Sequence, residues 1–278
     1  MSNLLDSRYR AMKKLPILLC IFLLSACAPS EVPSDKLVER NGIKYEINSQ
    51  IPFTGVATVY YKNGQLMSKL TYKDGKQNGL AESYYDNGQL EFKGNWKGGK
   101  LNGIFEGYRE NGQLEFKETH KDGKLNGLAK SYHKNGQLMS KDTYKDGELN
   151  GLSKYRENGQ LKFKGTYKDG ELNGLSEYRE NGQLEFKGTY KGKELNGIFE
   201  GYRENGQLEF KDTYKDGKLN GLARMYYENG QLMIKVTYKD GKLNGIFESY
   251  DENGQEEDWS PVCYQNGEDA DISICKSL

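Results

Sequence analysis

The residues with the clearest chemistry in this 278-residue chain are its four cysteines. Cys27 ends the tetrapeptide Leu24-Ser25-Ala26-Cys27, which follows the basic pair Lys13-Lys14 and an apolar run over residues 15–24. A basic stretch, a short apolar stretch and a small-residue cleavage site in this order are typical of a secretory signal peptide. Cleavage before Cys27 would make this cysteine the first residue of the mature chain.

The tetrapeptide resembles the bacterial lipobox, in which the cysteine is lipidated and becomes the new first residue. We therefore predict that residues 1–26 are a lipoprotein signal peptide and that the mature chain is lipid-anchored in the bacterial cell envelope. Ala28, which is not aspartate, predicts the outer membrane if the cell has one. The alternatives are an ordinary signal peptide or a buried apolar segment, since the apolar run is too short to span a bilayer comfortably.

Two cysteines remain after processing, because Cys20 leaves with the signal peptide and Cys27 carries the lipid. Cys263 and Cys275 would then be the only free pair, in a compartment that permits disulfides. A bridge between them would close a short loop and stabilise the C-terminal end of the chain by about 3 kcal/mol in the chain-entropy model.

Catalytic and metal-binding chemistry has little support in the sequence. The two histidines, His120 and His133, stand where other copies of an internal repeat have tyrosine, tryptophan or arginine. The sequence lacks a nucleophile elbow, a phosphate loop and metal-ligand spacing, and the acidic run at residues 268–271 does not match a calcium-binding loop. Lys and Arg balance Asp and Glu at 40 each, which gives no electrostatic case for nucleic acid. We expect a non-enzymatic protein without metal, cofactor or nucleic-acid partner.

The elements that must position these residues belong to a repeat array. The tripeptide Asn-Gly-Gln recurs every 24 residues, with two steps of 23, and its asparagines are Asn63, Asn87, Asn111, Asn135, Asn158, Asn181, Asn205, Asn229 and Asn253. A second Asn-Gly, which follows Leu or Gln, keeps the same spacing from Asn78 to Asn244. A fixed period of this size predicts a quasi-linear array in which each unit contacts mainly its neighbours.

Within each unit the hydrophobic pattern has a period of two. Leu90, Phe92, Gly94 and Trp96 alternate with polar residues between Asn87-Gly88 and the turn at Gly98-Gly99. Such alternation between turn signals predicts antiparallel strands, and Asn-Gly and Asp-Gly favour type I′ turns. The predicted fold class is therefore all-β, an elongated array of stacked antiparallel β-hairpins. Eight units at roughly 10 Å each give a ribbon on the order of 80 Å long.

The return strand of each unit contains an interior Asn-Gly, at Asn102-Gly103 for example, which we interpret as a bulge or bend. Two short units lose one residue between this glycine and the following tyrosine. A one-residue slip turns the side chains to the other face. We therefore predict that a bulge of the long units is absent at residues 152–155 and 175–178.

We predict that the chain divides into five parts. Residues 1–26 are the signal peptide, and residues 27–35, with Pro29 and Pro33, are a tether. Residues 36–55 are an N-terminal capping unit that contains a hairpin at Asn41-Gly42. Residues 56–254 are the repeats, and residues 255–278, where the pattern breaks, are a C-terminal cap.

One aromatic side chain per unit is expected to line up along one sheet face. These residues are Tyr72, Trp96, Tyr144, Tyr167, Tyr190, Tyr214 and Tyr238. They either pack on their neighbours as a thin core or form an exposed binding face for a partner protein or for sugar rings.

The recurring pattern, Tyr, Asn-Gly-Gln-Leu, Lys and Tyr-Lys-Asp-Gly-Lys-Leu-Asn-Gly, as at residues 202–221, resembles the MORN-repeat variant family. The resemblance runs from about Pro52 to Gln255, and Asn41-Gly42-Ile43-Lys44-Tyr45 is similar to the family's entry segment. Members of that family are commonly described as the antitoxin component of bacterial toxin–antitoxin modules. The lipobox would place this chain across the membrane from a cytoplasmic toxin. The resemblance therefore implies an envelope protein-binding or immunity function, and the alternative is a carbohydrate- or cell-wall-binding lipoprotein.

Overall fold

The computed structural model describes residues 30–276. The predicted signal peptide, Cys27 and the first part of the predicted tether lie outside the described residues. Among the described residues, no helix has the length and apolar character needed to cross a membrane.

Twenty strands form one sheet, and two more form a separate hairpin. The strands of the large sheet are β1 (Glu31–Pro33), β4 (Gly55–Tyr60), β5 (Leu66–Lys73), β6 (Lys76–Tyr84), β7 (Leu90–Lys97), β8 (Lys100–Tyr108), β9 (Leu114–Lys121), β10 (Lys124–Tyr132), β11 (Leu138–Lys145), β12 (Glu148–Glu157), β13 (Gln160–Lys168), β14 (Glu171–Glu180), β15 (Gln183–Lys191), β16 (Glu194–Tyr202), β17 (Leu208–Lys215), β18 (Lys218–Tyr226), β19 (Leu232–Lys239), β20 (Lys242–Ser249), β21 (Val262–Gln265) and β22 (Glu268–Ala270). The hairpin is β2 (Leu37–Arg40) with β3 (Ile43–Glu46), and the short helices are η1 (Ser34–Lys36) and α1 (Ile272–Cys275).

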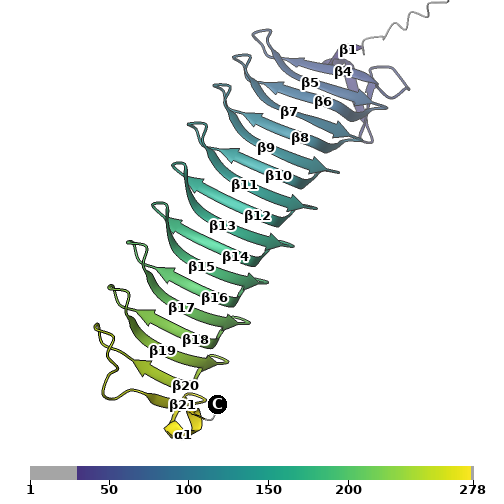
Figure 1. Cartoon of the computed structure of the whole chain (residues 1–278). Helices are drawn as coiled ribbons and strands as arrows, with labels where there is room; N and C mark the ends of the chain where they lie inside the picture. Colours follow the sequence, from purple (N-terminus) through teal and green to yellow (C-terminus); the bar gives the residue numbers. More distant parts are fainter. Residues whose placement is uncertain (1–29, 277–278) are drawn as a thin grey trace, which may run out of the picture.

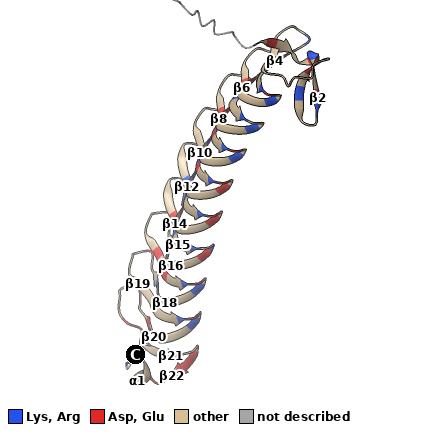
Figure 2. Ribbon diagram, turned by 90° about the vertical axis from the view of Figure 1, so that its right-hand side faces the viewer, with Lys and Arg blue, Asp and Glu red and all other residues tan. Residues whose placement is uncertain are grey.

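From β4 to β22 each strand pairs antiparallel with the next strand along the chain. The result is an open, elongated, single-layer sheet, as Figure 1 shows. Figure 2 shows that the strands bend, so that each hairpin has the shape of a hook. The prediction of an all-β array of stacked antiparallel hairpins is confirmed.

The Asp-Gly turns at one edge of the array are type I′, as predicted. Asp74 and Gly75 have φ values of 51° and 74°, and Asp122 and Gly123 have 52° and 84°. Two consecutive residues with positive φ match the twist of the flanking strands.

The Asn-Gly-Gln turns of the 24-residue units differ from the predicted type I′. Only the glycine, Gly88 for example, has positive φ, at 82°. The Gly88 amide donates to the Tyr85 carbonyl, and the Tyr85 amide donates to the Gln89 carbonyl, which makes this a type I turn followed by a one-residue bulge. The Asn87 side chain completes the loop, because its Oδ1 accepts from the Gln89 amide at 2.9 Å. The type I′ prediction is therefore wrong for these turns.

The two 23-residue units do have type I′ turns here, since Asn158 and Asn181 have φ values of 49° and 50°. The missing residue therefore comes from the turn. The register shift found between Ser131 and Tyr132 is retained between Tyr155 and Arg156. The prediction that a bulge is lost in the short units is wrong, because a two-residue turn absorbs the deletion. Tyr155 nevertheless takes the place of Ser131, and both lie opposite Ser140.

The interior Asn-Gly is a bulge, as predicted. On the β7–β8 pair, Gly94 lies opposite Phe105 and Trp96 lies opposite Leu101, so three residues face one. The asparagine of this bulge holds two units together, because Asn126 Nδ2 donates to Asp146 Oδ1 of the next unit at 3.1 Å. Equivalent contacts join Asn150 with Asp169, Asn196 with Asp216, and Asn220 with Asp240.

The N-terminal end is more ordered than a tether. Residues 31–33 form β1, which pairs parallel with β4 and covers the first edge of the sheet. The tether prediction is wrong for these residues. The hairpin β2–β3 turns at Asn41-Gly42, as predicted, but it packs on the first Asp-Gly turn, where the Lys44 amide donates to the Gly75 carbonyl.

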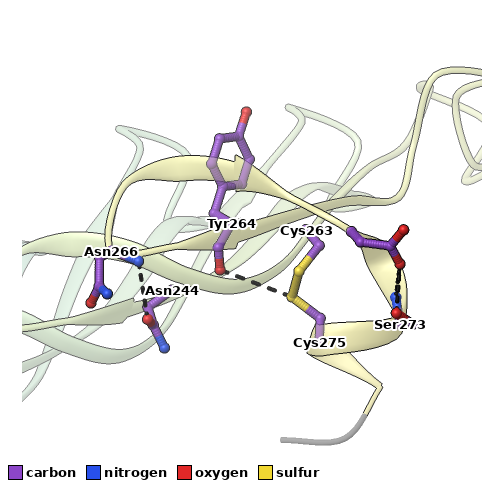
Figure 3. Close-up of a disulfide and its surroundings, with 7 residues drawn as sticks. Asn244, Cys263, Tyr264, Asn266, Ser273 and Cys275 are labelled. Carbon is purple, nitrogen blue, oxygen red and sulfur yellow. Dashed lines mark hydrogen bonds between the residues drawn. A yellow bond between two sulfur atoms is a disulfide. The ribbon is translucent and has the colours of Figure 1, made fainter.

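The C-terminal end continues the array before it closes it. β21 pairs with β20 and turns at Asn266-Gly267 into β22. The predicted disulfide joins Cys263 of β21 to Cys275 of α1 (Figure 3). The bridge fixes α1 against the last hairpin, and both of its cysteines are buried.

Candidate functional site

The predicted aromatic residues share one place in the sheet. Each lies opposite a glycine, as Trp96 lies opposite Gly79 and Tyr214 lies opposite Gly197, and in every case except Tyr72 this is the glycine of an interior Asn-Gly. His120 and Tyr264 occupy the same place in their units. We call the sheet side that carries Leu90, Phe92, Trp96 and their equivalents the aromatic face.

The aromatic face is both packed and accessible. Trp96 contacts Phe105 edge-on at 6.1 Å between ring centroids, and Tyr214 contacts Phe199 in the same way at 6.1 Å. Burial raises the pKa of the phenols of Tyr144 and Tyr190, yet all seven predicted aromatics keep intermediate exposure. Among the described residues no second layer covers this face, so the row serves as a thin core and as a surface at once.

A groove of about 370 Å³ lies on the aromatic face near the C-terminal end. Its lining residues are Phe199, Phe210, Asp212, Tyr214, Leu219, Ala223, Met225, Ile234, Val236, Tyr238 and Phe247. The volume lies within the range typical of small-ligand sites, and one carboxylate among apolar and aromatic side chains could fix the orientation of a ligand.

Acidic residues stand on the aromatic face at three equivalent places. Glu118 accepts from His120 Nε2 at 2.8 Å, and Asp142 accepts from Ser153 Oγ at 2.6 Å. Asp212 lies opposite Phe199 and Ala223, which offer no side-chain donor. Burial raises the pKa of Asp212, and the Arg224 backbone amide lowers it by a smaller amount.

The opposite side of the sheet carries a row of charged side chains, one per strand from β5 to β20. Lys93 and Lys117 flank Glu106 at 3.0 and 2.7 Å, and the Tyr108 hydroxyl donates to the same carboxylate. The hydrogen bond from Lys117 is the main cause that holds the Glu106 pKa at about 2. Glu200 has equivalent partners in Lys187, Lys211 and Tyr202.

In the middle of the array this row no longer alternates between lysine and glutamate. Lys130 lies opposite both Lys117 and Lys141, and Lys154 lies opposite both Lys141 and Lys164. Five lysines therefore follow one another across β9–β13. The turn tips vary in charge as well, with lysine after most glycines and glutamate at Glu148, Glu171 and Glu194, as Figure 2 shows.

The two histidines have structural contacts. His133 Nε2 lies 3.0 Å from the Arg156 carbonyl, and because a carbonyl only accepts, the ring nitrogen donates. Tyr85 and Arg109 make the same contact with the carbonyl 23 residues ahead, so His133 replaces them in function as well as in position. No group of three or more His, Cys, Asp or Glu among the described residues could hold a metal ion.

Sequence reasoning located the aromatic row but missed Asp212 and the lysine run. The repeat pattern gives no signal for Asp212, because its column holds three acidic residues as well as the glycines Gly94, Gly165 and Gly188. The lysine run required the strand register, since its members are 10 to 13 residues apart along the chain.

The family comparison agrees with the architecture. The model of the MORN repeat variant matches the chain eight times, at residues 53–74, 77–97, 101–122, 125–146, 150–169, 173–191, 195–216 and 219–240. A search of curated proteins gave no match. The eight matches cover more than half of the sequence and coincide with the stacked hairpins of the sheet. The chain belongs to the MORN repeat variant family.

Proposed function

We propose that this protein is a lipid-anchored, non-enzymatic module of the bacterial cell envelope that binds a partner protein on its aromatic face. The observation that carries the proposal is the half-exposed aromatic row on an uncovered single-layer sheet. Aromatic rings that pack against neighbouring rings on the sheet stay rigid, and rigid aromatic side chains lose little entropy on binding. An immunity or antitoxin-like function is the form of protein binding that the family resemblance favours.

The binding test uses substitutions that the array itself already tolerates. His120 stands in the aromatic row, so Tyr167→His, Tyr190→His and Tyr214→His in one chain should preserve the fold while reducing the aromatic surface. The matched control changes the opposite face, with Lys141→Gln and Lys154→Gln. Tagged mature protein is used to capture partners from envelope extracts.

We expect one partner protein to be captured by the wild type and by the lysine control and to be lost from the triple-histidine variant. Failure to capture a partner, or equal loss in both variants, would contradict the proposal. The same aromatic row also supports the cell-wall alternative, because sugar rings stack on aromatic side chains. Co-sedimentation with purified peptidoglycan that is lost in the triple-histidine variant would favour that alternative.

The anchor has its own test. Growth with a labelled lipid precursor should label the wild-type protein, and Cys27→Ser should abolish the label because the serine cannot form the thioether. A Cys20→Ser chain is the control, since that residue lies inside the predicted signal peptide. Equal labelling of wild type and Cys27→Ser would overturn the lipoprotein assignment.

A further inference from the structure

We propose that the groove at Asp212 binds a positively charged side chain, arginine or lysine, that a partner protein presents between apolar residues. This inference rests on the proposed protein-binding function of the aromatic face and names the chemistry that one part of that face recognises. The groove lies on β16–β20, and Asp212 lines it together with Phe210, Tyr214 and Met225.

Asp212 lacks the side-chain donor that the acidic residues at equivalent places in other units have. The carboxylates of Glu118 and Asp142 each have a side-chain donor within the chain, at 2.8 and 2.6 Å. Asp212 lies between Phe199 and Ala223 across the two strand pairs, and no described side chain donates to it. The Arg224 backbone amide interacts with this carboxylate, but without a side-chain donor the carboxylate keeps acceptor capacity that an external cation can satisfy.

The walls of the groove are mostly aromatic and apolar. Four aromatic side chains line the groove together with Asp212, namely Phe199, Phe210, Tyr214 and Tyr238. Aromatic faces attract cations, and arginine stacks on them particularly well. The groove holds about 370 Å³, far more than one ion requires, so apolar residues on either side of the cation have room to pack on Leu219, Val236 and Phe247.

The neighbouring units show that the feature is local. Val236 occupies the equivalent place in the next unit and Gly188 occupies it in the preceding unit. A carboxylate at this place is therefore not required by the fold. Ser153, the donor to Asp142, corresponds to Ala223, so the groove lacks the internal partner that is present three units earlier.

The test uses two neutral-capped peptides, acetyl-Leu-Arg-Leu-amide and acetyl-Leu-Gln-Leu-amide, titrated into the full mature chain by calorimetry or NMR. We expect the arginine peptide to bind at least tenfold more tightly than the glutamine peptide. Asp212→Asn should remove this difference. Ala223→Ser should weaken arginine-peptide binding about tenfold, because the serine hydroxyl would satisfy Asp212 from within.

Asp142→Asn is the matched control and should leave both affinities unchanged, and circular dichroism should show all variants folded with similar melting temperatures. Equal affinity for the two peptides, no binding of either, or an arginine preference that survives Asp212→Asn would each overturn the inference. Butylguanidinium that binds as tightly as the arginine peptide would overturn the assignment to a partner side chain. Capture of a protein partner through the aromatic row alongside any of these results would leave the proposed function intact.

Discussion

At the scale of single residues, equivalent side chains differ in whether a partner is present. Ser153 and Ser176 occupy the same place in consecutive units and are both buried. Ser153 Oγ donates to Asp142 at 2.6 Å, whereas Ser176 Oγ has no partner and its column neighbours are Gly165 and Gly188. The two serines therefore form a matched pair, because both are buried but only Ser153 makes a side-chain hydrogen bond.

This difference predicts opposite effects of the same substitution. Ser176→Ala should raise the free energy of unfolding by about 1 kcal/mol, because it removes a buried hydroxyl without a partner. Ser153→Ala should lower the free energy of unfolding by about 1–2 kcal/mol, because it leaves the Asp142 carboxylate without its donor. Urea denaturation measures both values, and equal signs for the two substitutions would contradict the explanation.

The Glu106 cluster predicts a dependence on pH. The pKa of Glu106 falls from its ordinary 4.5 to about 2 in the folded chain, because of the hydrogen bonds from Lys117, Lys93 and Tyr108. The unfolded chain therefore binds a proton first as pH falls, and stability is lost between about pH 4.5 and 2. Glu106→Gln should destabilise the protein by about 1–2 kcal/mol at pH 7, an amount reduced by solvent screening of the partly exposed lysines.

The measurement is denaturation of wild type and Glu106→Gln at pH 7 and at pH 2. The difference between them should shrink at the lower pH, where the wild-type carboxyl group is itself partly protonated. Glu185→Gln serves as a control, since Glu185 forms no ion pair within the described part of the chain. A difference that stays constant with pH would mean that the charge of Glu106 does not contribute.

At the scale of elements, the stacking of hairpins depends on contacts repeated from unit to unit. Tyr85 Oη donates to the Tyr108 carbonyl at 2.8 Å, and Tyr227 Oη donates to the Tyr250 carbonyl at 2.9 Å. At the other edge, asparagine-to-aspartate hydrogen bonds join successive turns, as between Asn220 and Asp240. Contacts of these two kinds therefore tie hairpins to their neighbours at both edges of the sheet, while the strands between them supply the ladder.

The lysine run across β9–β13 differs from these stabilising contacts, because it places like charges opposite one another. Like charges that lie directly opposite on neighbouring strands destabilise a sheet. Lys130→Glu with Lys154→Glu restores the alternation seen at Glu106 and Glu177 and should raise the free energy of unfolding by about 1 kcal/mol at low salt. The gain should decrease in high salt, because ions screen exposed charges.

The control for this prediction is Lys62→Glu with Lys134→Glu, which changes the net charge equally at exposed loop positions outside the strand pairs. Other units already carry glutamate at that place, for example Glu110 and Glu204. We expect a change in stability near zero. An equal gain in both double variants would show that net charge, and not cross-strand pairing, is responsible.

At the scale of the whole molecule, the chain is an open ribbon without a thick core. Buried apolar side chains are few, and among the described residues they include Val56, Ala81, Ala223 and Val236. Stability must therefore come from the hydrogen-bonded ladder and from side chains that are half covered on a sheet face. Such arrays gain stability from the interfaces between units, which is why both ends are closed, by β1 at one end and by α1 with its disulfide at the other.

The elongated shape gives a scattering prediction. Twenty strands spaced about 4.8 Å apart give a sheet about 90 Å long. A thin rod of that length has a radius of gyration of about 26 Å, whereas a compact globule of this size has one of about 18 Å. Small-angle scattering of the chain from Ala28 onward should give the larger value. A value of about 18 Å would mean that the ribbon folds back on itself in solution.

The sequence by itself determined the strands, the hairpin order, the Asp-Gly turns and the single aromatic row. The physical reason is that alternation of side chains and the demand for positive φ at turns act locally, so they can be read from neighbouring residues. Because the 24-residue unit recurs many times, the same local pattern is seen in each copy and supports one interpretation. The disulfide followed from the cysteine count.

Only the tertiary structure decided which side chains meet across strands. The turn at Asn87-Gly88 depends on a backbone hydrogen bond between Tyr85 and Gln89. The same dipeptide, Asn-Gly, adopts type I′ geometry at Asn158-Gly159, where the unit is one residue shorter. Likewise, Asp212 and Asp142 look alike in sequence, yet one faces alanine and the other faces a serine hydroxyl. The strand register fixes these pairings, and register depends on bulges and turn lengths summed over the whole unit.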